Sequence, residues 1–227
     1  MTQFYDAVVI DLDGTLVDTL GDFVCVLNLC LREMSLPSLA SDDVRLMVGK
    51  GSEHLIASAL SKVVAGWPEL NCPQHNELKS RARELYMRHY PQVNGLHSHV
   101  YPGVFEGLQT LREYSIPLAC LTNKPLAFAR ALLEQKNLLP HFSHVFGGDS
   151  FAHKKPHPEP LLQTCIALGS TPSRTLMVGD SSNDAQAAHA AGCPVALVTY
   201  GYNHGQNIAQ CGHNHLLSDL RDLCKIC

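Results

Sequence analysis

The stretch AVVIDLDGT, residues 7–15, joins an apolar run to two carboxylates and a glycine. A short continuous apolar run of this kind is typical of a strand buried in a parallel sheet. Open parallel sheets bind ligands at the carboxyl ends of their strands, so we expect Asp11 and Asp13 to lie at a binding site. Two such carboxylates can divide the roles of nucleophile and proton donor. An isolated Asp-x-Asp pair is more often an ordinary turn, so the prediction depends on the rest of the chain.

Similar apolar runs recur along the chain and alternate with helical patterns. Strands are predicted at residues 6–10, 117–121, 143–147, 174–178 and 194–198. This alternation indicates a parallel sheet with crossover helices. Between the first two strands only helical patterns appear, near residues 19–34, 41–48, 52–65 and 75–90. We therefore predict an α/β protein with a Rossmann-like parallel sheet core, residues 1–15 and 97–227, and an all-helical cap, residues 16–96, inserted after the first strand.

Two features of the predicted cap bear on its function. The chain should cross between core and cap at residues 14–19 and 91–102, where glycines and prolines interrupt the helical pattern. The turn containing Gly49, Lys50 and Gly51 opens a cap helix, and its glycines would expose main-chain N–H groups to an anion. An ordinary connection between two helices explains the same residues. If the turn contacts the substrate, Lys50 is the expected side chain, because a closing cap needs an element that recognises the leaving group.

The composition argues against several classes of protein. The chain has 227 residues, of which 45% are hydrophobic, and a formal net charge of −4. Its 17 Lys and Arg residues are scattered, so no partner nucleic acid is expected. No basic leader precedes the first strand, and the apolar run at residues 23–31 is too short to span a bilayer, so no membrane partner is expected. We expect a cytoplasmic protein whose nine cysteines are reduced.

Three further groups of polar residues follow predicted strands. They are TNKP at residues 122–125, KKP at residues 154–156 and GDSSND at residues 179–184. Because the carboxyl ends of parallel strands share one edge, we expect these groups to meet Asp11 and Asp13 there. Acids, a hydroxyl, a lysine and helix N-termini together suit a phosphate ester. The acids offer hard oxygen ligands without a His or Cys partner, which favours Mg²⁺ over Zn²⁺.

In this order the motifs resemble those of the haloacid dehalogenase superfamily of phosphohydrolases, and the match extends over nearly the whole chain. The four family motifs appear as Asp11-Leu12-Asp13-Gly14-Thr15, Leu121-Thr122-Asn123, Lys155-Pro156, and Gly179-Asp180 with Asp184. Within the superfamily the chain is similar to the phosphoglycolate phosphatase branch. That similarity depends on LVDT at residues 16–19, TNKP at 122–125, AAHAAG at 187–192 and VTYGY at 198–202.

The resemblance implies roles in catalysis or in phosphate binding for five of the motif residues. Asp11 would be the nucleophile that forms an aspartyl phosphate. Asp13 would protonate the leaving alcohol and then activate water as a base. Thr122 and Asn123 would bind the phosphoryl group, together with Lys155, which would also stabilise the nucleophile. These roles are physically consistent, since one carboxylate must stay ionised while its neighbour carries a proton.

The resemblance also implies a Mg²⁺ site, in which Asp180 joins the nucleophile and the main-chain carbonyl of Asp13. Asp184 would lie behind these ligands and orient Lys155 or a metal-bound water. Lys154 could take the inward position of its neighbour, but we prefer Lys155 because the motif proline follows it directly. A positioned cation at that place would stabilise the in-line transition state.

The predicted activity is Mg²⁺-dependent hydrolysis of a small phosphomonoester through an aspartyl phosphate, and the branch resemblance favours 2-phosphoglycolate. A sugar phosphate, a nucleotide or pyridoxal phosphate stays open as the substrate, since the motifs do not specify the leaving group. A sugar phosphomutase is disfavoured, because mutases of this family tend to carry Val where this chain has Thr15. A non-catalytic binding protein is disfavoured because every motif position is filled. The oligomeric state stays open.

Two other groups of residues could bind metal or undergo redox chemistry, but ordinary explanations are preferred. Cys224 and Cys227 have CxxC spacing at the end of the chain without a second pair, so we expect a frayed helix end. Cys211, His213 and His215 stand in polar surroundings after the last predicted strand, so we expect them in a surface loop.

Overall fold

A computed structural model describes residues 5–65 and 73–227 of the chain. Six parallel strands form its main sheet, in the order β5-β4-β1-β6-β7-β8. They are β1 (Ala7–Ile10), β4 (Leu118–Leu121), β5 (His144–Phe146), β6 (Thr175–Gly179), β7 (Val195–Val198) and β8 (His215–Leu217). The first five correspond to the predicted strands, which confirms the α/β fold with its parallel sheet. Strand β8 was missed, because it has three residues and only one of them is buried.

Strand β1 lies at the centre of the sheet. Its Val9 is paired with Ala119 of β4 on one side and with Met177 of β6 on the other. All four residues of β1 are buried, as expected of a central strand covered on both faces. The main-chain N–H of Asp11 donates to the carbonyl of Val178 at 2.9 Å, which extends the pairing by one residue. The sheet itself therefore fixes the start of the loop that carries the two predicted catalytic acids.

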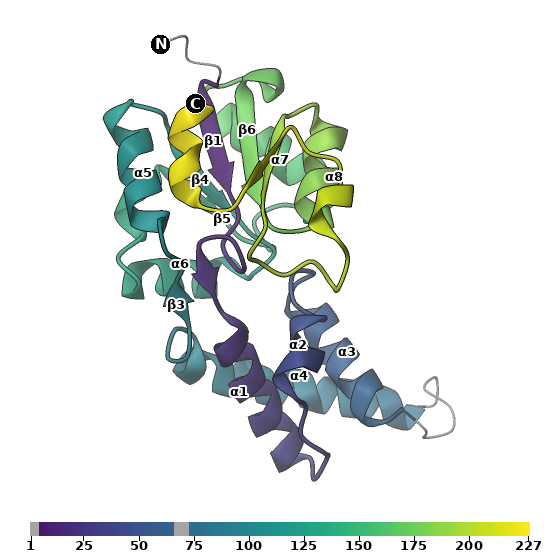
Figure 1. Cartoon of the computed structure of the whole chain (residues 1–227). Coiled ribbons are helices and arrows are strands. Elements are labelled where there is room, and N and C mark those ends of the chain that lie inside the picture. Colours follow the sequence, from purple (N-terminus) through teal and green to yellow (C-terminus); the bar gives the residue numbers. More distant parts are fainter. Residues whose placement is uncertain (1–4, 66–72) are drawn as a thin grey trace.

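Helices cover both faces of the sheet (Figure 1). They are α5 (Val104–Glu113), α6 (Leu126–Gln135), α7 (Glu159–Ala167) and α8 (Ser182–Ala191). Val8 and Ile10 belong to one hydrophobic cluster with residues of α5 and α6, whereas Val9 belongs to another with residues of α7 and α8. The alternation follows from the two-residue period of a strand. Short 3-10 helices lie at Leu139–His141 (η1), Pro172–Arg174 (η2), Ile208–Gln210 (η3) and Leu220–Lys225 (η4).

Four helices lie beyond the end of the sheet toward which β1 points (Figure 1). They are α1 (Leu20–Glu33), α2 (Ser41–Arg45), α3 (Ser52–Val63) and α4 (Pro73–Val93). Buried residues of all four form a separate hydrophobic cluster, so these helices have a core of their own. The all-helical segment after the first strand is therefore confirmed, while its exact boundaries stay a prediction. None of the described helices is long and apolar enough to cross a membrane.

The chain leaves the core through β2 (Val17–Asp18) and returns through β3 (His99–Val100), and these two strands pair antiparallel. The expectation that the second crossing begins at Pro91 is wrong, because α4 continues through this residue to Val93. Proline lacks an N–H and leaves one helical carbonyl unpaired. Pro91 itself is exposed and lies in the last turn of the helix, where water can replace the lost bond.

The returning segment is held from both sides. The buried carboxylate of Asp22, in α1, accepts hydrogen bonds from the main-chain N–H groups of Gly95 and His97, each at 2.7 Å. On the core side, Lys136 Nζ donates to the carbonyl oxygens of Gly95 at 2.8 Å and Ser98 at 2.7 Å. These bonds connect α1 to α6 through the crossing and satisfy main-chain groups at the joint.

The C-terminal segment is more ordered than the sequence suggested. The expected frayed end is instead the helix η4, whose Leu220 and Leu223 are fully buried, and Cys227 packs against the core. His215 is not in a surface loop, because it begins β8 and its Nε2 lies 2.9 Å from the hydroxyl of Tyr5. The three-residue sequence His-Leu-Leu is too short to show the apolar run by which the other strands were predicted. All cysteines of the described ranges are free thiols.

Candidate active site

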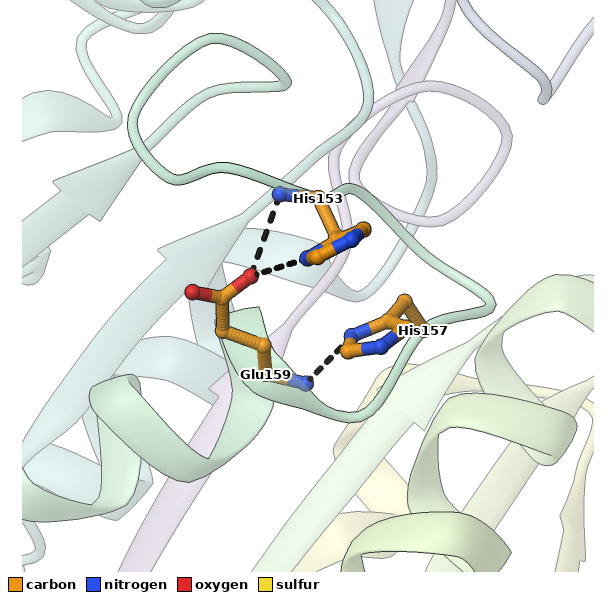
Figure 2. Close-up of side chains that lie close together, drawn as sticks. All are labelled: His153, His157 and Glu159. Carbon is orange, nitrogen blue, oxygen red and sulfur yellow. Dashed lines mark hydrogen bonds and ion pairs between the residues drawn. The ribbon is translucent and has the colours of Figure 1, made fainter.

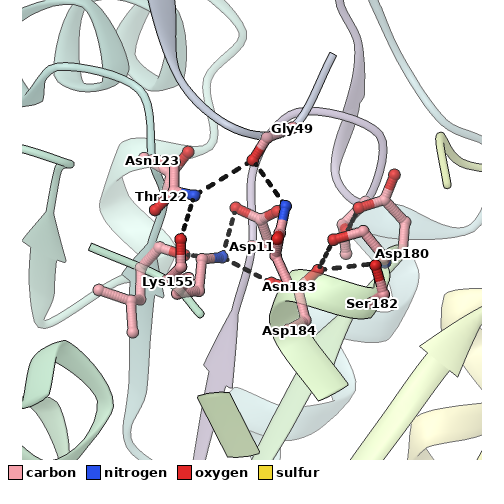
Figure 3. A network of polar contacts seen from close by, with 12 residues as sticks. Asp11, Gly49, Thr122, Asn123, Lys155, Asp180, Ser182, Asn183 and Asp184 are labelled. Carbon is pink, nitrogen blue, oxygen red and sulfur yellow. Dashed lines mark hydrogen bonds and ion pairs between the residues drawn. The ribbon is translucent and has the colours of Figure 1, made fainter. Parts of the chain in front are cut away.

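Polar side chains that follow the three central strands come together at the carboxyl edge of the sheet (Figure 3). Asp11 and Asp13 follow β1, Thr122 and Asn123 follow β4, and Asp180 follows β6. All five residues are buried. This convergence is the one expected from the sequence, and the parallel topology explains it, since strand ends far apart in the sequence meet at one edge.

Lys155 lies at the centre of this group. Its Nζ donates to the carbonyl of Leu121 and to Oδ1 of Asp184, both at 2.7 Å, and lies 3.0 Å from Oδ1 of Asp11. Burial opposes its charge, but the two carboxylates outweigh burial and raise the pKa of Lys155, so it stays protonated. Lys154 is exposed. Of the two adjacent lysines, Lys155 is therefore the one that points into the site, as preferred from the sequence.

Asp184 fixes Lys155 from the first turn of α8. Its Oδ1 accepts from Lys155, while its Oδ2 accepts from the main-chain N–H of Ser181 at 3.1 Å and from the Ser181 hydroxyl at 2.7 Å. The serine and the aspartate form a capping box, which satisfies donors at the helix start. A Cβ on Gly179 would lie 2.3 Å from Cγ of Asp184, so only glycine leaves room for this carboxylate.

Carboxylate oxygens of Asp11, Asp180 and Asp184 lie within 4.8 Å of one another and could hold a metal ion. Oδ1 of Asp11 is buried and accepts no hydrogen bond, although it forms the ion pair with Lys155. Burial raises the pKa of Asp11 to about 7 against the opposing effect of Lys155. Burial and the neighbouring acids likewise raise the pKa of Asp180. A bound cation would favour the ionised forms, so the donor set fits a hard divalent ion.

Two glycines and one main-chain N–H hold Asp180 in place. The N–H of Tyr202 donates to Oδ2 of Asp180 at 2.5 Å. A Cβ on Gly14 would lie 2.0 Å from the same oxygen, and a Cβ on Gly201 would lie 2.4 Å from it. Gly14 also has a φ of +86°, which suits glycine. The loop after β1 and the loop after β7 thus enclose this carboxylate, and side chains at these positions would displace it.

The same tyrosine also contacts the start of the cap. The Tyr202 hydroxyl accepts hydrogen bonds from the N–H groups of Thr19 at 2.9 Å and Leu20 at 3.1 Å, and it donates to Oδ1 of Asp18. Its ring belongs to the hydrophobic cluster of the cap. One residue of the core therefore contacts both a candidate metal ligand and the first crossing.

Thr122 and Asn123 differ in the donors that they can offer a phosphate. The Thr122 hydroxyl accepts from the N–H of Lys124 at 3.2 Å, which leaves its own hydrogen to donate. The side-chain amide of Asn123 donates to the carbonyls of Gly49 at 3.1 Å and Lys155 at 2.8 Å. Both hydrogens of that amide are then in use. A phosphate contact with Asn123, as the sequence predicted, would have to use its main-chain N–H.

The cap turn at Gly49, Lys50 and Gly51 lies over the site. The carbonyl of Gly49 accepts from the side-chain amides of Asn123 and Asn183, the latter at 3.2 Å (Figure 3). The φ angles of the two glycines are +112° and +86°, which explains why glycine occupies both positions. Lys50 is exposed, and it does not line the cavity over Asp11. The turn thus reaches the site through its main chain.

A buried lysine beside Asp13 was missed as a site residue. Lys124 Nζ lies 3.0 Å from Oδ1 of Asp13 and donates to the hydroxyl of Tyr90. The ammonium also lies 4.8 Å from the ring centre of Phe23 and 5.0 Å from that of Tyr90. From the sequence, Lys124 was considered only as a member of the TNKP motif, with no role of its own. Its position directly after the predicted phosphate-binding residues Thr122 and Asn123 could have identified it as a site residue.

Core and cap together line a cavity over the two predicted catalytic acids. Its core side is polar and its cap side is mainly apolar. The lining residues are Asp11, Asp13, Thr122, Asn123, Lys124 and Pro125 from the core and Phe23, Val48, Gly49, Gly51, Ser52, Leu55, Tyr86 and Tyr90 from the cap. A substrate held here would have its reacting end at the sheet and its remainder against the cap.

Comparison with known proteins agrees with this geometry. The sequence model of haloacid dehalogenase-like hydrolases matches residues 5–192. The chain belongs to this family of hydrolases. A phosphoglycolate phosphatase from Nitrosospira multiformis is 40% identical over 220 residues, which cover 97% of this chain and 94% of that protein. Another from Thiobacillus denitrificans is 38% identical and covers 90% and 87%.

The fold is also shared with a solved structure. The crystal structure of a predicted phosphoglycolate phosphatase from Haemophilus somnus has a TM-score of 0.92 and 33% sequence identity. The match covers 100% of this chain and 99% of that one. The family predicted from the four motifs, and the similarity to the phosphoglycolate phosphatase branch, are therefore confirmed.

The hydrolase carries a second group of side chains of metal-binding types, which was not predicted as a site from the sequence (Figure 2). The exposed rings of His153 and His157 stack with 3.9 Å between their centres. Nδ1 of His153 lies 2.6 Å from Oε2 of Glu159, and Nδ1 of His157 accepts from the Glu159 N–H at 3.2 Å. These contacts hold the loop that contains Lys155 against the first turn of α7, so the group fixes that loop.

Proposed function

We propose that this hydrolase is a Mg²⁺-dependent phosphatase that acts on a small phosphomonoester through an aspartyl phosphate, with 2-phosphoglycolate as its substrate. The observation that carries the proposal is the buried Asp11 at the central strand end, in ion-pair contact with Lys155 and in a cavity that the cap helps to line. Relatives about 40% identical over nearly the whole chain are named phosphoglycolate phosphatases, which supports this choice of substrate.

In the proposed first step, a carboxylate oxygen of Asp11 attacks phosphorus in line with the leaving group. The bond from phosphorus to the ester oxygen breaks, and Asp13 transfers a proton to that oxygen. The hydroxyl of Thr122 is available to donate to a phosphoryl oxygen. Lys155 balances the negative charge of Asp11 and of the phosphoryl group.

In the second step, Asp13 takes a proton from water, whose oxygen attacks phosphorus and releases phosphate and the free Asp11 carboxylate. Asp11 and Asp180 would hold Mg²⁺ with the carbonyl of Asp13, and the ion would neutralise phosphoryl charge. Asp184 would act through Lys155, because its oxygens already accept from that lysine and from Ser181. We also place the enzyme in the cytoplasm, without a nucleic acid or membrane partner.

The test is phosphate release by the purified full-length chain from 2-phosphoglycolate, glucose 6-phosphate, a nucleoside monophosphate, pyridoxal phosphate and p-nitrophenyl phosphate. We expect activity with Mg²⁺, none after chelation, and the highest kcat/KM for 2-phosphoglycolate. Higher kcat/KM for another phosphomonoester would overturn the choice of substrate. Full activity after exhaustive chelation would overturn the metal requirement.

A further inference from the structure

We infer that Lys124, with the hydroxyl of Tyr90, forms the subsite that binds a carboxylate on the leaving group. The inference rests on the proposed phosphatase function and narrows its substrates to small phosphomonoesters whose leaving group is an anion. It assigns substrate selectivity to a core lysine that the cap encloses, in place of the exposed Lys50.

The first support is the burial of a charged group. The Lys124 side chain is only 3% exposed. Removing an ammonium from water is costly unless charged or polar partners replace the water. Within the described part of the chain, its hydrogen-bonding partners are Asp13 Oδ1 and the Tyr90 hydroxyl. An ammonium has three N–H donors, so one is left for a ligand in the cavity.

The second support is the distribution of charge around the cavity. Lys155 is engaged by Asp11 and Asp184 beneath the reacting end. Lys124 lines the cavity, and its ammonium contacts Tyr90 and Phe23 of the cap. The surrounding cap wall is apolar and aromatic, and it includes Phe23 and Tyr86. An anion entering such a wall needs a cation, whereas a neutral leaving group does not.

The third support is distance. Lys124 Nζ lies 3.0 Å from Oδ1 of Asp13, the proposed proton donor to the ester oxygen. A carboxylate bound to this ammonium would therefore lie close to the ester oxygen that Asp13 protonates. In 2-phosphoglycolate one methylene carbon carries the ester oxygen and the carboxylate together. The short distance between Lys124 and Asp13 suits that short leaving group, and the rings of Phe23 and Tyr90 lie beside the ammonium, with centres 4.8 and 5.0 Å from it.

The experiment compares 2-phosphoglycolate with ethyl phosphate, which has a two-carbon leaving group without the carboxylate. Lys124→Met keeps the length and apolar character of the stem and removes the charge. We expect its kcat/KM for 2-phosphoglycolate to fall about 10- to 100-fold more than that for ethyl phosphate, mainly through KM. Lys124→Arg should restore part of the preference, because it restores the charge. Lys154→Met is the matched control, since it removes an exposed neighbouring charge, and it should keep the wild-type preference.

A binding measurement gives a second readout. Glycolate should inhibit hydrolysis of ethyl phosphate competitively in the wild type and about tenfold more weakly in Lys124→Met. Tyr90→Phe, which keeps the ring, should shift the substrate preference in the same direction. This variant keeps the inference testable if Lys124→Met fails to fold. Equal losses on both substrates in every folded variant would overturn the subsite and make Lys124 a structural partner of Asp13.

Failure of the underlying function would look different. If the wild type has the same kcat/KM for ethyl phosphate and for 2-phosphoglycolate, or hydrolyses neither, then the proposed substrate is wrong. The wild type alone decides this point, without any variant. If the wild type prefers 2-phosphoglycolate and Lys124→Met keeps that preference, the function stands and the subsite is overturned.

Discussion

The main-chain N–H of Tyr202 lies 2.5 Å from Oδ2 of Asp180, and Gly201 packs against the same carboxylate. A Cβ at residue 201 would lie 2.3 Å from Cβ of Asp180. We therefore expect Gly201→Ala to displace the carboxylate and to raise the Mg²⁺ concentration for half-maximal activity by about 10- to 100-fold. The control is Tyr202→Phe, which keeps the N–H and should keep the wild-type Mg²⁺ requirement. A Gly201→Ala enzyme with an unchanged requirement would argue against Asp180 as a ligand.

Replacing Asp11 with Asn should leave the fold intact and remove turnover, because an amide is a poor nucleophile. We expect a loss of at least about a thousandfold in kcat, or about 4 kcal/mol of barrier. The measurement is phosphate release by protein shown by mass spectrometry to be free of deamidated enzyme. Wild-type turnover by such protein would falsify the nucleophile assignment.

The affinity for Mg²⁺ should depend on pH. Burial raises the pKa of Asp11 to about 7, so the metal-free protein carries a proton there at lower pH. Mg²⁺ must displace this proton, so its affinity should rise as the pH increases from about 6 to about 8. The thermal shift that Mg²⁺ produces, measured at constant metal concentration, should increase over this range. A shift that is independent of pH, or that decreases, would contradict the prediction.

Asp22 should matter for stability, although it lies outside the catalytic group. Asp22→Ala leaves the N–H groups of Gly95, which is buried, and of His97 without their acceptor. We expect the free energy of unfolding to fall by about 1–3 kcal/mol, measured by urea denaturation. Asp42→Ala, at an exposed position of α2, serves as control and should change stability by less than about 0.5 kcal/mol. Equal effects of the two changes would show that the joint is not stabilised in this way.

Lys50 is expected to contribute little. Its side chain is exposed and lies outside the cavity lining, so Lys50→Ala should change kcat/KM by less than about twofold on 2-phosphoglycolate and on p-nitrophenyl phosphate alike. A selective loss on 2-phosphoglycolate would return this residue to the substrate site. It would also weaken the case for Lys124.

The parallel sheet was predictable because buried strands of this type are continuous apolar runs, and Ala7–Ile10 is such a run. The convergence of Asp11, Thr122 and Asp180 then follows from topology alone. Strand β8 was not predictable in the same way, since His215–Leu217 is short and only one of its residues is buried. Pro91 was misleading, because α4 includes this proline and ends only two residues later, at Val93.

Within the site, the positions of the acids after the predicted strands were enough to predict them. The contacts that each side chain makes could not be predicted in this way. Lys124 is adjacent in sequence to residues that were predicted correctly, yet its contact with Tyr90 joins α4 to the loop after β4 across 34 residues. Asn123 was assigned to phosphate, whereas its amide holds the main chain of the cap turn and of Lys155. Such contacts depend on how the cap packs against the core, and no local pattern specifies that.

The contact that joins the cap turn to the catalytic edge uses the carbonyl of Gly49, which any peptide unit possesses, and the amides of Asn123 and Asn183. Because the cap contributes only a main-chain oxygen to this contact, substitutions of other cap side chains need not remove it. The amides of Asn123 and Asn183 can therefore hold the cap turn in the same place while the cap side chains around the cavity differ. Substrate selectivity can change in this way without any change to the catalytic residues of the core.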